Sequence, residues 1–472
     1  MRCPNRRRVR AVFRPVCPVA LLVSLLPLIA CGPSGSERRP SGTNNAARQP
    51  PRPATRAAVD RHFSAKGCQG CHPVQYQQWK QSLHAKAHTE PVYDFYFMTA
   101  SRDDKKLEPF CGRCHTPIGT MTGQIPFKHA LRKAGDTRVG AVAAEGLGCD
   151  FCHTITGHTK VQNAGFVVRP SETKRGPLKG ARAVSHGVKH DPYYRTAEYC
   201  GTCHQVVHPT NGILLETTYA EWKASPYAKA GILCQDCHMT DGLAPAVADA
   251  RGLGKPLRHP GKAAVMGAQR AHVSRHYFVG PNLMFSQGPE AAELRKRSEA
   301  LLRRAARVAV GEVTRKGGAL QVIVRVTNTG AGHSIPTGVT ELRQVWLEVK
   351  VTTPSGRVLL HSGARDTSDR IAPGAVVYRT HVYDAQGRDT TLFWRTVRKG
   401  RDRRIPPTKT LTETFRIPAS AATRRAGKLT VAVALHYRSV PPWGLTEAGV
   451  PPGTVKVPVF TMARARRELT VR

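Results

Sequence analysis

The sequence predicts an α+β chain of more than one domain, in which a mainly helical and loop-rich part is followed by a connector helix and an antiparallel β-sandwich. Three observations carry this prediction. Short helical stretches broken by Gly and Pro accompany a repeated C-x-x-C-H motif within residues 62–287. A strongly amphipathic stretch fills residues 288–310, and hydrophobic alternation with a period of two residues runs through 311–472.

The N-terminal 30 residues have the features of a lipoprotein signal peptide. Met1–Arg14 carries six arginines and no acidic residue, and Val19–Ala30 is an apolar run too short to span a bilayer comfortably. The run ends in Leu28–Cys31, which resembles a bacterial lipobox, so we expect Cys31 to be lipidated; a plain signal peptide with a chance cysteine is the alternative. This predicts an exported outer-membrane lipoprotein of the periplasm, with the leaflet undecided, tethered by a disordered segment over 31–61.

Five copies of C-x-x-C-H follow, and each is typical of a covalent c-type haem site. Two thiols form thioethers with the porphyrin, and the adjacent imidazole binds the iron. A zinc ribbon requires thiolate pairs but no histidine after them, whereas all five pairs here are followed by a histidine. The motifs therefore predict five haem c groups on a domain over 62–287. The attaching cysteines are Cys68, Cys71, Cys111, Cys114, Cys149, Cys152, Cys200, Cys203, Cys234 and Cys237, and the iron-binding histidines are His72, His115, His153, His204 and His238.

Helix and strand patterns place the remaining elements. Tyr76–His88 contains good helix formers, and we expect a helix on which His84 and His88 share one face. The amphipathic stretch 288–310 predicts the connector helix. Alternating stretches separated by Gly and Pro turns predict the strands of the β-sandwich. These stretches are 319–328, 344–353, 357–361, 375–383, 410–417 and 428–437.

The chain is strongly basic. Its formal net charge is +40, and without the six arginines of the leader 66 basic residues stand against 32 acidic ones. Such an excess favours anionic partners, either an acidic redox protein or lipid head groups. No nucleic-acid-binding motif accompanies the charge, so we expect no nucleic-acid partner.

Several longer motifs resemble the multihaem cytochromes c related to the cytochrome c-554 type, over almost the whole mature chain. In that family four histidines resemble distal iron ligands. They are those of W-x-x-S-x-H, H-x-F-x-G-x-N and G-H-x-x-P-T-G, and one about fourteen residues before C-G-x-C-H. The resemblance implies that His84, His186, His276 and His333 are distal ligands. The matching segments are Trp79–Ala85, Cys111–Pro117, Glu145–Ile155, Tyr199–Pro209, Thr218–Met239, His276–Asn282 and Asn328–Gly338.

Alternatives to these distal ligands stay open. His88, His190 and His272 each lie four residues from one of the first three candidates. The fifth haem has no clear candidate: His88, His158 and His208 compete, and a five-coordinate iron is an alternative.

Two functions agree with this pattern. An electron carrier between periplasmic or outer-membrane redox partners needs closely spaced six-coordinate haems. A reductase of nitrite, hydroxylamine or a sulfur oxyanion needs one five-coordinate haem. Related enzymes often mark that haem with lysine in place of the motif histidine, and none of the five motifs here does so. We therefore favour the carrier and leave the question of catalysis open.

Overall fold

The structure is a computed structural model that describes residues 64–125, 139–241, 258–281 and 289–471. All of these lie within one unit of the chain, Pro53–Arg472. The predicted signal peptide, Cys31 and the tether 31–61 lie outside the described residues. Among the described residues, no helix combines the length and hydrophobicity that a membrane crossing requires.

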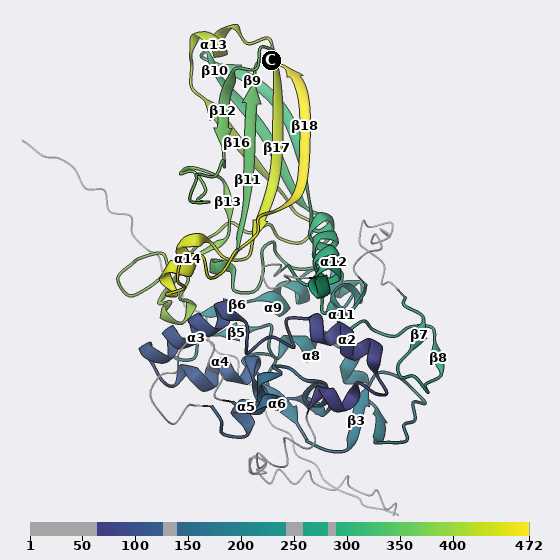
Figure 1. The fold of residues 1–472 in the computed structure, drawn as a ribbon. Helices are drawn as coiled ribbons and strands as arrows, with labels where there is room; N and C mark the ends of the chain where they lie inside the picture. Colours follow the sequence, from purple (N-terminus) through teal and green to yellow (C-terminus); the bar gives the residue numbers. More distant parts are fainter. Residues whose placement is uncertain (1–63, 126–138, 242–257, 282–288, 472) are drawn as a thin grey trace, which may run out of the picture. The chain divides into compact units, whose positions relative to one another are not determined.

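Short helices make up most of the part that carries the C-x-x-C-H motifs (Figure 1). Several begin at a proline in the first helical turn, where the missing N–H costs no hydrogen bond. At the start of the longest of them, Glu90 accepts hydrogen bonds from the N–H groups of Val92 and Tyr93 at 2.6 and 2.7 Å. The helices and 3-10 turns are η1 (Ala65–Cys68), α2 (Pro73–Gln81), α3 (Pro91–Asp103), α4 (Leu107–His115), α5 (Pro117–Met121), α6 (Ala141–Ala144), α7 (Cys149–His153), η2 (Pro192–Arg195), α8 (Ala197–Gly201), α9 (Thr218–Lys223), α10 (Pro226–Lys229) and α11 (Cys234–His238).

Four small two-stranded sheets join these helices. Three are antiparallel, whereas β3 and β4 run parallel. The pairs are β1 (Ile155–His158) with β2 (Phe166–Val168), β3 (Thr173–Gly176) with β4 (Gly187–His190), β5 (Val206–Val207) with β6 (Leu214–Glu216), and β7 (Gly261–Lys262) with β8 (Gln269–Arg270).

The helix predicted over Tyr76–His88 is wrong in extent. α2 ends at Gln81, and His84 and His88 lie in the turns that follow rather than on one helical face. Tertiary contacts provide the reason, because the His84 carbonyl accepts the N–H of Leu147 at 2.9 Å. The Leu147 carbonyl in turn accepts the indole N–H of Trp79 at 2.8 Å. The His84 carbonyl thus accepts a long-range N–H in place of the His88 N–H that a continuous helix would supply.

The connector helix is also shorter than predicted. α12 spans Pro289–Ala305, and the residues up to Val310, predicted to be helical, belong to strand β9 (Ala306–Lys316). This strand pairs with its neighbour β10 (Ala319–Asn328) along its length, with Val308 opposite Val326 and Val310 opposite Val324. The β-branched residues of this segment favour that pairing over a further helical turn.

Two larger antiparallel sheets follow the connector. One has the strand order β16-β10-β9, and the other has the order β12-β11-β17-β18, with β13 also paired to β11. Each of the six predicted stretches contains a strand, whereas β9, β15 and β18 were not predicted. The elements after β10 are η4 (Thr340–Leu342), β11 (Gln344–Thr352), β12 (Val358–Ser362), β13 (Val377–Tyr378), β14 (Thr380–Tyr383), η5 (Phe393–Arg395), β15 (Arg398–Asp402), β16 (Thr410–Ile417), α13 (Ala421–Arg425), β17 (Lys428–Arg438), α14 (Pro442–Glu447) and β18 (Phe460–Thr470).

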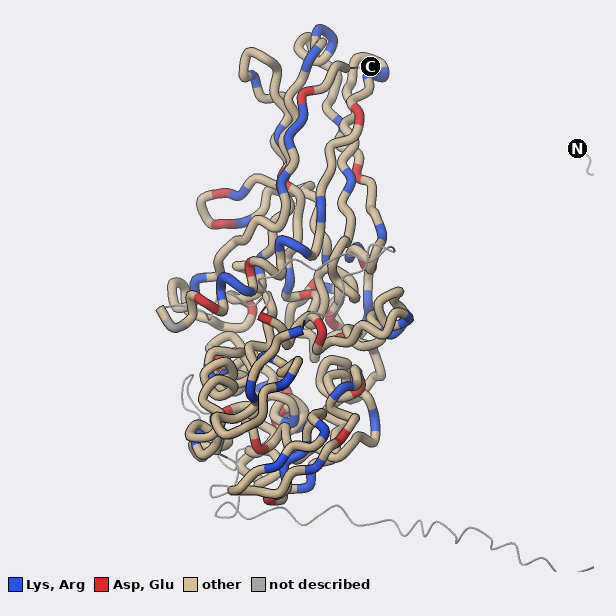
Figure 2. Tube along the Cα trace, turned by 90° about the vertical axis from the view of Figure 1, so that its right-hand side faces the viewer, with Lys and Arg blue, Asp and Glu red and all other residues tan. Residues whose placement is uncertain are grey.

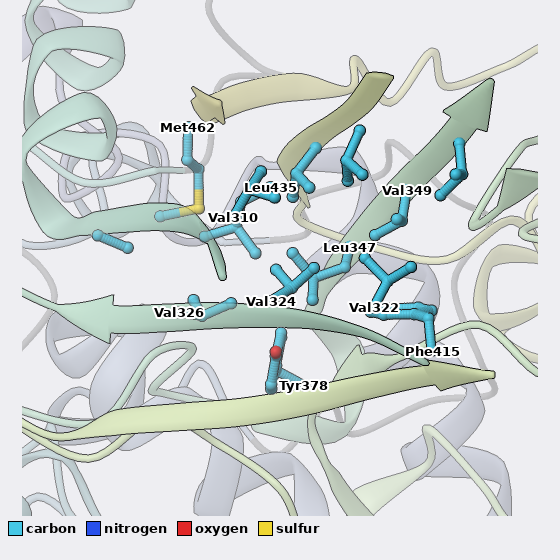
Figure 3. Packing of buried hydrophobic residues seen from close by; sticks show 14 of the residues in the cluster. Val310, Val322, Val324, Val326, Leu347, Val349, Tyr378, Phe415, Leu435 and Met462 are labelled. Atoms are coloured by element: carbon cyan, nitrogen blue, oxygen red, sulfur yellow. The ribbon is translucent and has the colours of Figure 1, made fainter. Parts of the chain in front are cut away.

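Both sheets contribute to one hydrophobic core (Figure 3). Val322 and Val324 from β10 lie in the same cluster as Leu347 from β11 and Leu435 from β17, and all four are fully buried. Alternate residues of each strand point into this cluster, which is why the period of two was visible in the sequence.

A second core joins the two parts of the chain. Tyr96 of α3 packs in one cluster with Leu392 and Trp394 from the loop between β14 and β15. Its hydroxyl lies 2.7 Å from Thr391 Oγ1 and donates to the Gly444 carbonyl at 3.1 Å. At the end of the same helix, Asp103 accepts hydrogen bonds from Trp394 and Arg395. The motif-bearing helices are therefore held against the loops of the strand-rich part.

Candidate haem-binding centres

Each C-x-x-C-H motif closes a helical turn. In α4, α7 and α11 both cysteines and the histidine lie in one helix. In the other two motifs the N–H of the histidine donates to the carbonyl of the first cysteine: His72 to Cys68 at 2.9 Å and His204 to Cys200 at 3.0 Å. Residues three and four apart in a helical turn share one side, so each motif presents two thiols and an imidazole together.

Backbone carbonyls orient four of the five motif histidines. The Nδ1 atom of each ring donates to a carbonyl oxygen, which leaves Nε2 available for a metal. The acceptors are Ala263 for His72 (2.6 Å), Ala87 for His115 (2.8 Å), Arg175 for His153 (2.6 Å) and Val279 for His238 (2.6 Å).

The fifth motif histidine has a carboxylate partner instead. His204 Nδ1 lies 3.3 Å from Glu216 Oε1. Burial lowers the pKa of His204, but the hydrogen bond and the negative charge of Glu216 outweigh burial and raise it to about 9. Glu216 is the last residue of β6, and its pairing with Val206 of β5 brings it beside the motif.

Four motif histidines each face a second histidine ring across a similar distance. The four distances between ring centroids agree to within 0.1 Å, although the two rings of each pair come from segments far apart in the sequence. The pairs are His72 with His186 (6.3 Å), His153 with His276 (6.3 Å), His204 with His84 (6.3 Å) and His238 with His333 (6.2 Å).

This spacing fits two axial imidazoles on one iron. An imidazole nitrogen binds a transition metal at about 2 Å and lies roughly 1 Å from the ring centroid, so two axial rings have centroids roughly 6 Å apart. Burial lowers the pKa of His84 and of His276 to about 3, and that of His238 to about 4, with smaller effects from neighbouring histidines. These rings are therefore neutral at pH 7, the form that binds a metal. Together with the adjacent thiols, the donor set fits haem c.

The alternative distal ligands take other positions. His190 is exposed on β4, and His272 Nδ1 accepts the N–H of His259 at 3.1 Å. His88 is buried in a turn after α2, with its ring centroid 6.1 Å from that of Tyr93. The structure thus brings His84, His186 and His276, rather than these three alternatives, to a motif histidine.

The motif Cys111–His115 has a different environment. The ring of Tyr93 stacks on His115 with the centroids 4.0 Å apart and the planes 5° from parallel. Among the described residues, no imidazole faces His115 at the spacing of the four pairs; His62 and His129 lie outside them. The proposed competitors are engaged elsewhere, since His158 lies 3.1 Å from the Tyr193 hydroxyl and His208 Nε2 donates to the Trp394 carbonyl at 2.7 Å.

Cysteines of different motifs meet in three places. Side-chain contacts bring Cys68 next to Cys149, Cys114 next to Cys203, and Cys200 next to Cys234. The first motif therefore adjoins the third, and the fourth adjoins both the second and the fifth. Among the described residues, none of the ten motif cysteines forms a disulfide, so each thiol is available for a thioether bond. The five candidate centres are thus neighbours rather than isolated sites.

The loop that carries His333 is held against the motif-bearing part by polar contacts. Glu221 of α9 accepts the N–H of Ser334 and the hydroxyl of Thr337, both at 3.0 Å. A Cβ at Gly332 would lie 3.2 Å from the ring of Tyr227, so glycine permits the close approach of this loop. The contacts place His333 beside His238 although it belongs to the strand-rich part.

Comparisons with known proteins agree with this site. Residues 67–154, which contain three of the motifs, match the family described as cytochrome c554 and c-prime. These matches support a multihaem c-type cytochrome of the c554 type. The crystal structure of a penta-heme cytochrome c552 from Thermochromatium tepidum is similar to this chain, with a TM-score of 0.58 and 20% identity, over 86% of this chain and 99% of that one. This confirms the resemblance seen in the sequence and supports the mixed α and β fold.

Other comparisons add little about this chain. A β-glucosidase 3B from Thermotoga neapolitana, in complex with α-D-glucose, matches over 35% of this chain and 16% of that one, with 16% identity and a TM-score of only 0.13. No curated protein matches the chain.

Three residues at these centres were missed by the sequence analysis. Glu216 and Tyr93 lie outside every recognisable motif, and only tertiary pairing brings them to His204 and His115. Glu221 lies within the quoted segment Thr218–Met239, but nothing in that segment shows that its carboxylate binds a loop more than one hundred residues later.

Proposed function

We propose that this cytochrome is an exported pentahaem protein that carries electrons between periplasmic or outer-membrane redox partners. The observation that supports it best is the set of four histidine pairs at 6.2–6.3 Å. An iron with two axial imidazoles has no coordination position left for a substrate, so such a centre suits electron transfer. Haem c, when bound, supplies the one-electron chemistry.

The arrangement of the motifs supports the same function. The cysteine contacts link the first motif to the third, and the second and fifth to the fourth. The rings of Tyr194 and Tyr199 lie 4.8 Å apart, and both hydroxyls donate to the Cys152 carbonyl of the third motif, at 2.8 and 2.9 Å. Since Tyr199 directly precedes Cys200, these contacts also connect the third and fourth motifs.

Low-temperature EPR of the purified oxidised protein, combined with haem quantification, tests this proposal. We expect five covalent haems that survive acid acetone extraction, with at least four low-spin irons. Two or more high-spin irons per chain, or fewer than five covalent haems, would contradict the pentahaem carrier.

A reductase is the second candidate, and one observation favours it. His115 is the one motif histidine whose ring stacks on a tyrosine instead of facing a second imidazole among the described residues. An iron held by His115 alone would offer one open position to nitrite, hydroxylamine or a sulfur oxyanion. One high-spin signal that changes on adding these anions, together with their turnover under reduced dye, would favour the enzyme. A spectrum without high-spin iron would exclude it.

Basic residues around the first motif support an acidic redox partner. Lys179, Arg182, Lys189 and Lys262 are exposed on segments next to His72 and His186. In Figure 2 this side of the chain faces the viewer, with several Lys and Arg segments along its lower loops. Such a surface would attract an acidic protein by long-range electrostatics. If so, the rate of reduction by an acidic redox protein should fall as ionic strength rises, whereas a rate independent of salt would contradict it.

The domain limits and the anchor belong to the same proposal. We propose a haem domain over 62–287, a connector, a β-sandwich that follows it, and lipidation at Cys31. The common hydrophobic core of the two larger sheets supports the sandwich.

A further inference from the structure

The five motif histidines provide an internal comparison, because all five rings are oriented through Nδ1. Four donate to backbone carbonyls at 2.6–2.8 Å. His204 instead donates to the carboxylate of Glu216 at 3.3 Å. The difference is in chemistry as well as in distance, since a carbonyl is neutral and a carboxylate carries a negative charge.

The surroundings of Glu216 keep this carboxylate in place. Its side chain is 12% exposed, and Oε1 also accepts the hydroxyl of Thr218 at 3.3 Å. The Thr218 hydroxyl lies 2.9 Å from Thr337 Oγ1 and accepts the N–H of Gly338 at 3.2 Å. The residue beside His204 is thus fixed by the loop that also carries His333.

A carboxylate at Nδ1 makes an imidazole a stronger electron donor to a metal at Nε2. A charge-assisted hydrogen bond is roughly twice as strong as a neutral one, and the negative charge favours the ferric over the ferrous state. Both effects lower the reduction potential of the haem iron.

We propose that Glu216 is a positioning residue that lowers the reduction potential of the haem attached at Cys200 and Cys203. The inference rests on the proposed haem site at His204. The cysteine contacts place this motif next to the second and the fifth. A haem of lowered reduction potential at this position would pass electrons on to the neighbouring haems and would not retain them.

Spectroelectrochemical titration of Glu216→Gln in the full haem-loaded protein tests this inference. The variant keeps the side-chain shape and an acceptor oxygen but removes the charge. We expect one of the haem midpoint potentials to rise by at least about 59 mV. For one electron this corresponds to a tenfold change in the oxidised-to-reduced ratio. The low-spin EPR signal of one haem should shift as well.

Glu198→Gln is the matched control. Glu198 lies on α8, two residues before Cys200, and its carboxylate accepts the hydroxyl of Tyr219 at 2.7 Å. The same charge is removed near the same haem, so this variant measures the general electrostatic effect. Unchanged potentials in Glu216→Gln, or an equal shift of the same haem in Glu198→Gln, would overturn the inference.

Two further measurements keep the test decisive. If Glu216→Gln binds fewer haems, Glu216→Asp takes its place. The shorter side chain of Asp lengthens the hydrogen bond to His204, so the potential should rise by less than in Glu216→Gln. An unchanged potential overturns the inference. The EPR spectrum of the unaltered protein separates this question from the proposed function. Too few low-spin haems there would contradict the carrier itself, whatever Glu216 does.

Discussion

Glu221 and Ser334 join the motif-bearing and strand-rich parts of the chain, with the Ser334 N–H donating to Glu221 Oε2 at 3.0 Å. Arg404 donates to the other oxygen of the same carboxylate, and both charged side chains are about nine-tenths buried. Because Ser334 follows His333 directly, this contact fixes the loop that brings His333 to His238. The carboxylate therefore contributes both to stability and to the geometry of a candidate haem site.

Replacing Glu221 by Ala should remove the buried partner of Arg404 and leave its guanidinium only the half-exposed carboxylate of Asp402, 2.7 Å from Nη2. Removal of one member of a buried ion pair typically costs about 3–5 kcal/mol in the free energy of unfolding, and because Asp402 still compensates part of the charge we expect a loss of about 1–3 kcal/mol. We expect the urea midpoint to fall and a fraction of one haem to become high-spin as the His333 loop loosens. Glu299→Ala is the control, since the Glu299–Arg303 pair is solvent-exposed and its loss should cost less than about 0.5 kcal/mol. Equal losses in the two variants would contradict the role of Glu221.

The strands that could be predicted are those in which hydrophobic residues alternate with polar ones along the sequence. β10 and β16 occupy the same residues as the predicted strands 319–328 and 410–417, because alternate side chains enter one core. β18 was missed because its outward positions are filled by Arg464 and Arg466, so the segment carries few of the apolar residues that mark a strand. The helix predicted over Tyr76–His88 was too long because a long-range hydrogen bond occupies the His84 carbonyl.

For the site, the attaching cysteines and motif histidines could be read from the sequence because each motif is a single turn. The pairing of rings could not. Nothing in the spacing of the chain shows that His84 lies opposite His204 rather than His72, or that Glu216 replaces a carbonyl at Nδ1. Such relationships depend on how separate turns and small sheets pack together, and not on local patterns.

Stability should depend on pH through Glu341. This residue is 1% exposed, and burial raises the pKa of its carboxyl to about 7, although Arg379, Lys399 and Arg343 oppose the shift. In the unfolded chain a glutamate has a pKa of about 4.3. Between these values the folded state holds a proton that the unfolded state has released, so stability is fully present below about pH 4.3 and falls as pH rises toward 7, by up to roughly 3 kcal/mol.

Urea unfolding of the unaltered protein and of Glu341→Gln at pH 5 and pH 8 checks this expectation. The variant cannot ionise, so its stability relative to the unaltered protein should be greater at pH 8 than at pH 5. A stability difference that is the same at both pH values would show that Glu341 does not titrate in this range.

Membrane attachment should depend on Cys31. From the lipobox-like segment Leu28–Cys31 we expect that Cys31→Ser moves the protein from the membrane fraction to the soluble periplasmic fraction, because the acyl chains would be its anchor. Cys17→Ser, within the same leader, is the control and should leave the protein on the membrane. Membrane retention of Cys31→Ser would refute the proposed lipid anchor.

His333 provides the sharpest test of the proposed distal ligands, because it lies in the strand-rich part while its ring faces His238 at 6.2 Å. Replacing His333 by Ala should remove a strong axial donor and convert one low-spin iron to high-spin, with a rise in that haem's potential. The remaining haems should keep their spectra, since the other three pairs contain different residues. His190→Ala is the matched control: His190 is exposed on β4 and should leave the EPR spectrum unchanged. If His333→Ala shows no new high-spin signal, the ring does not bind iron and the loop serves only to join the two parts of the chain; if His190→Ala produces the same signal, the change does not report ligation.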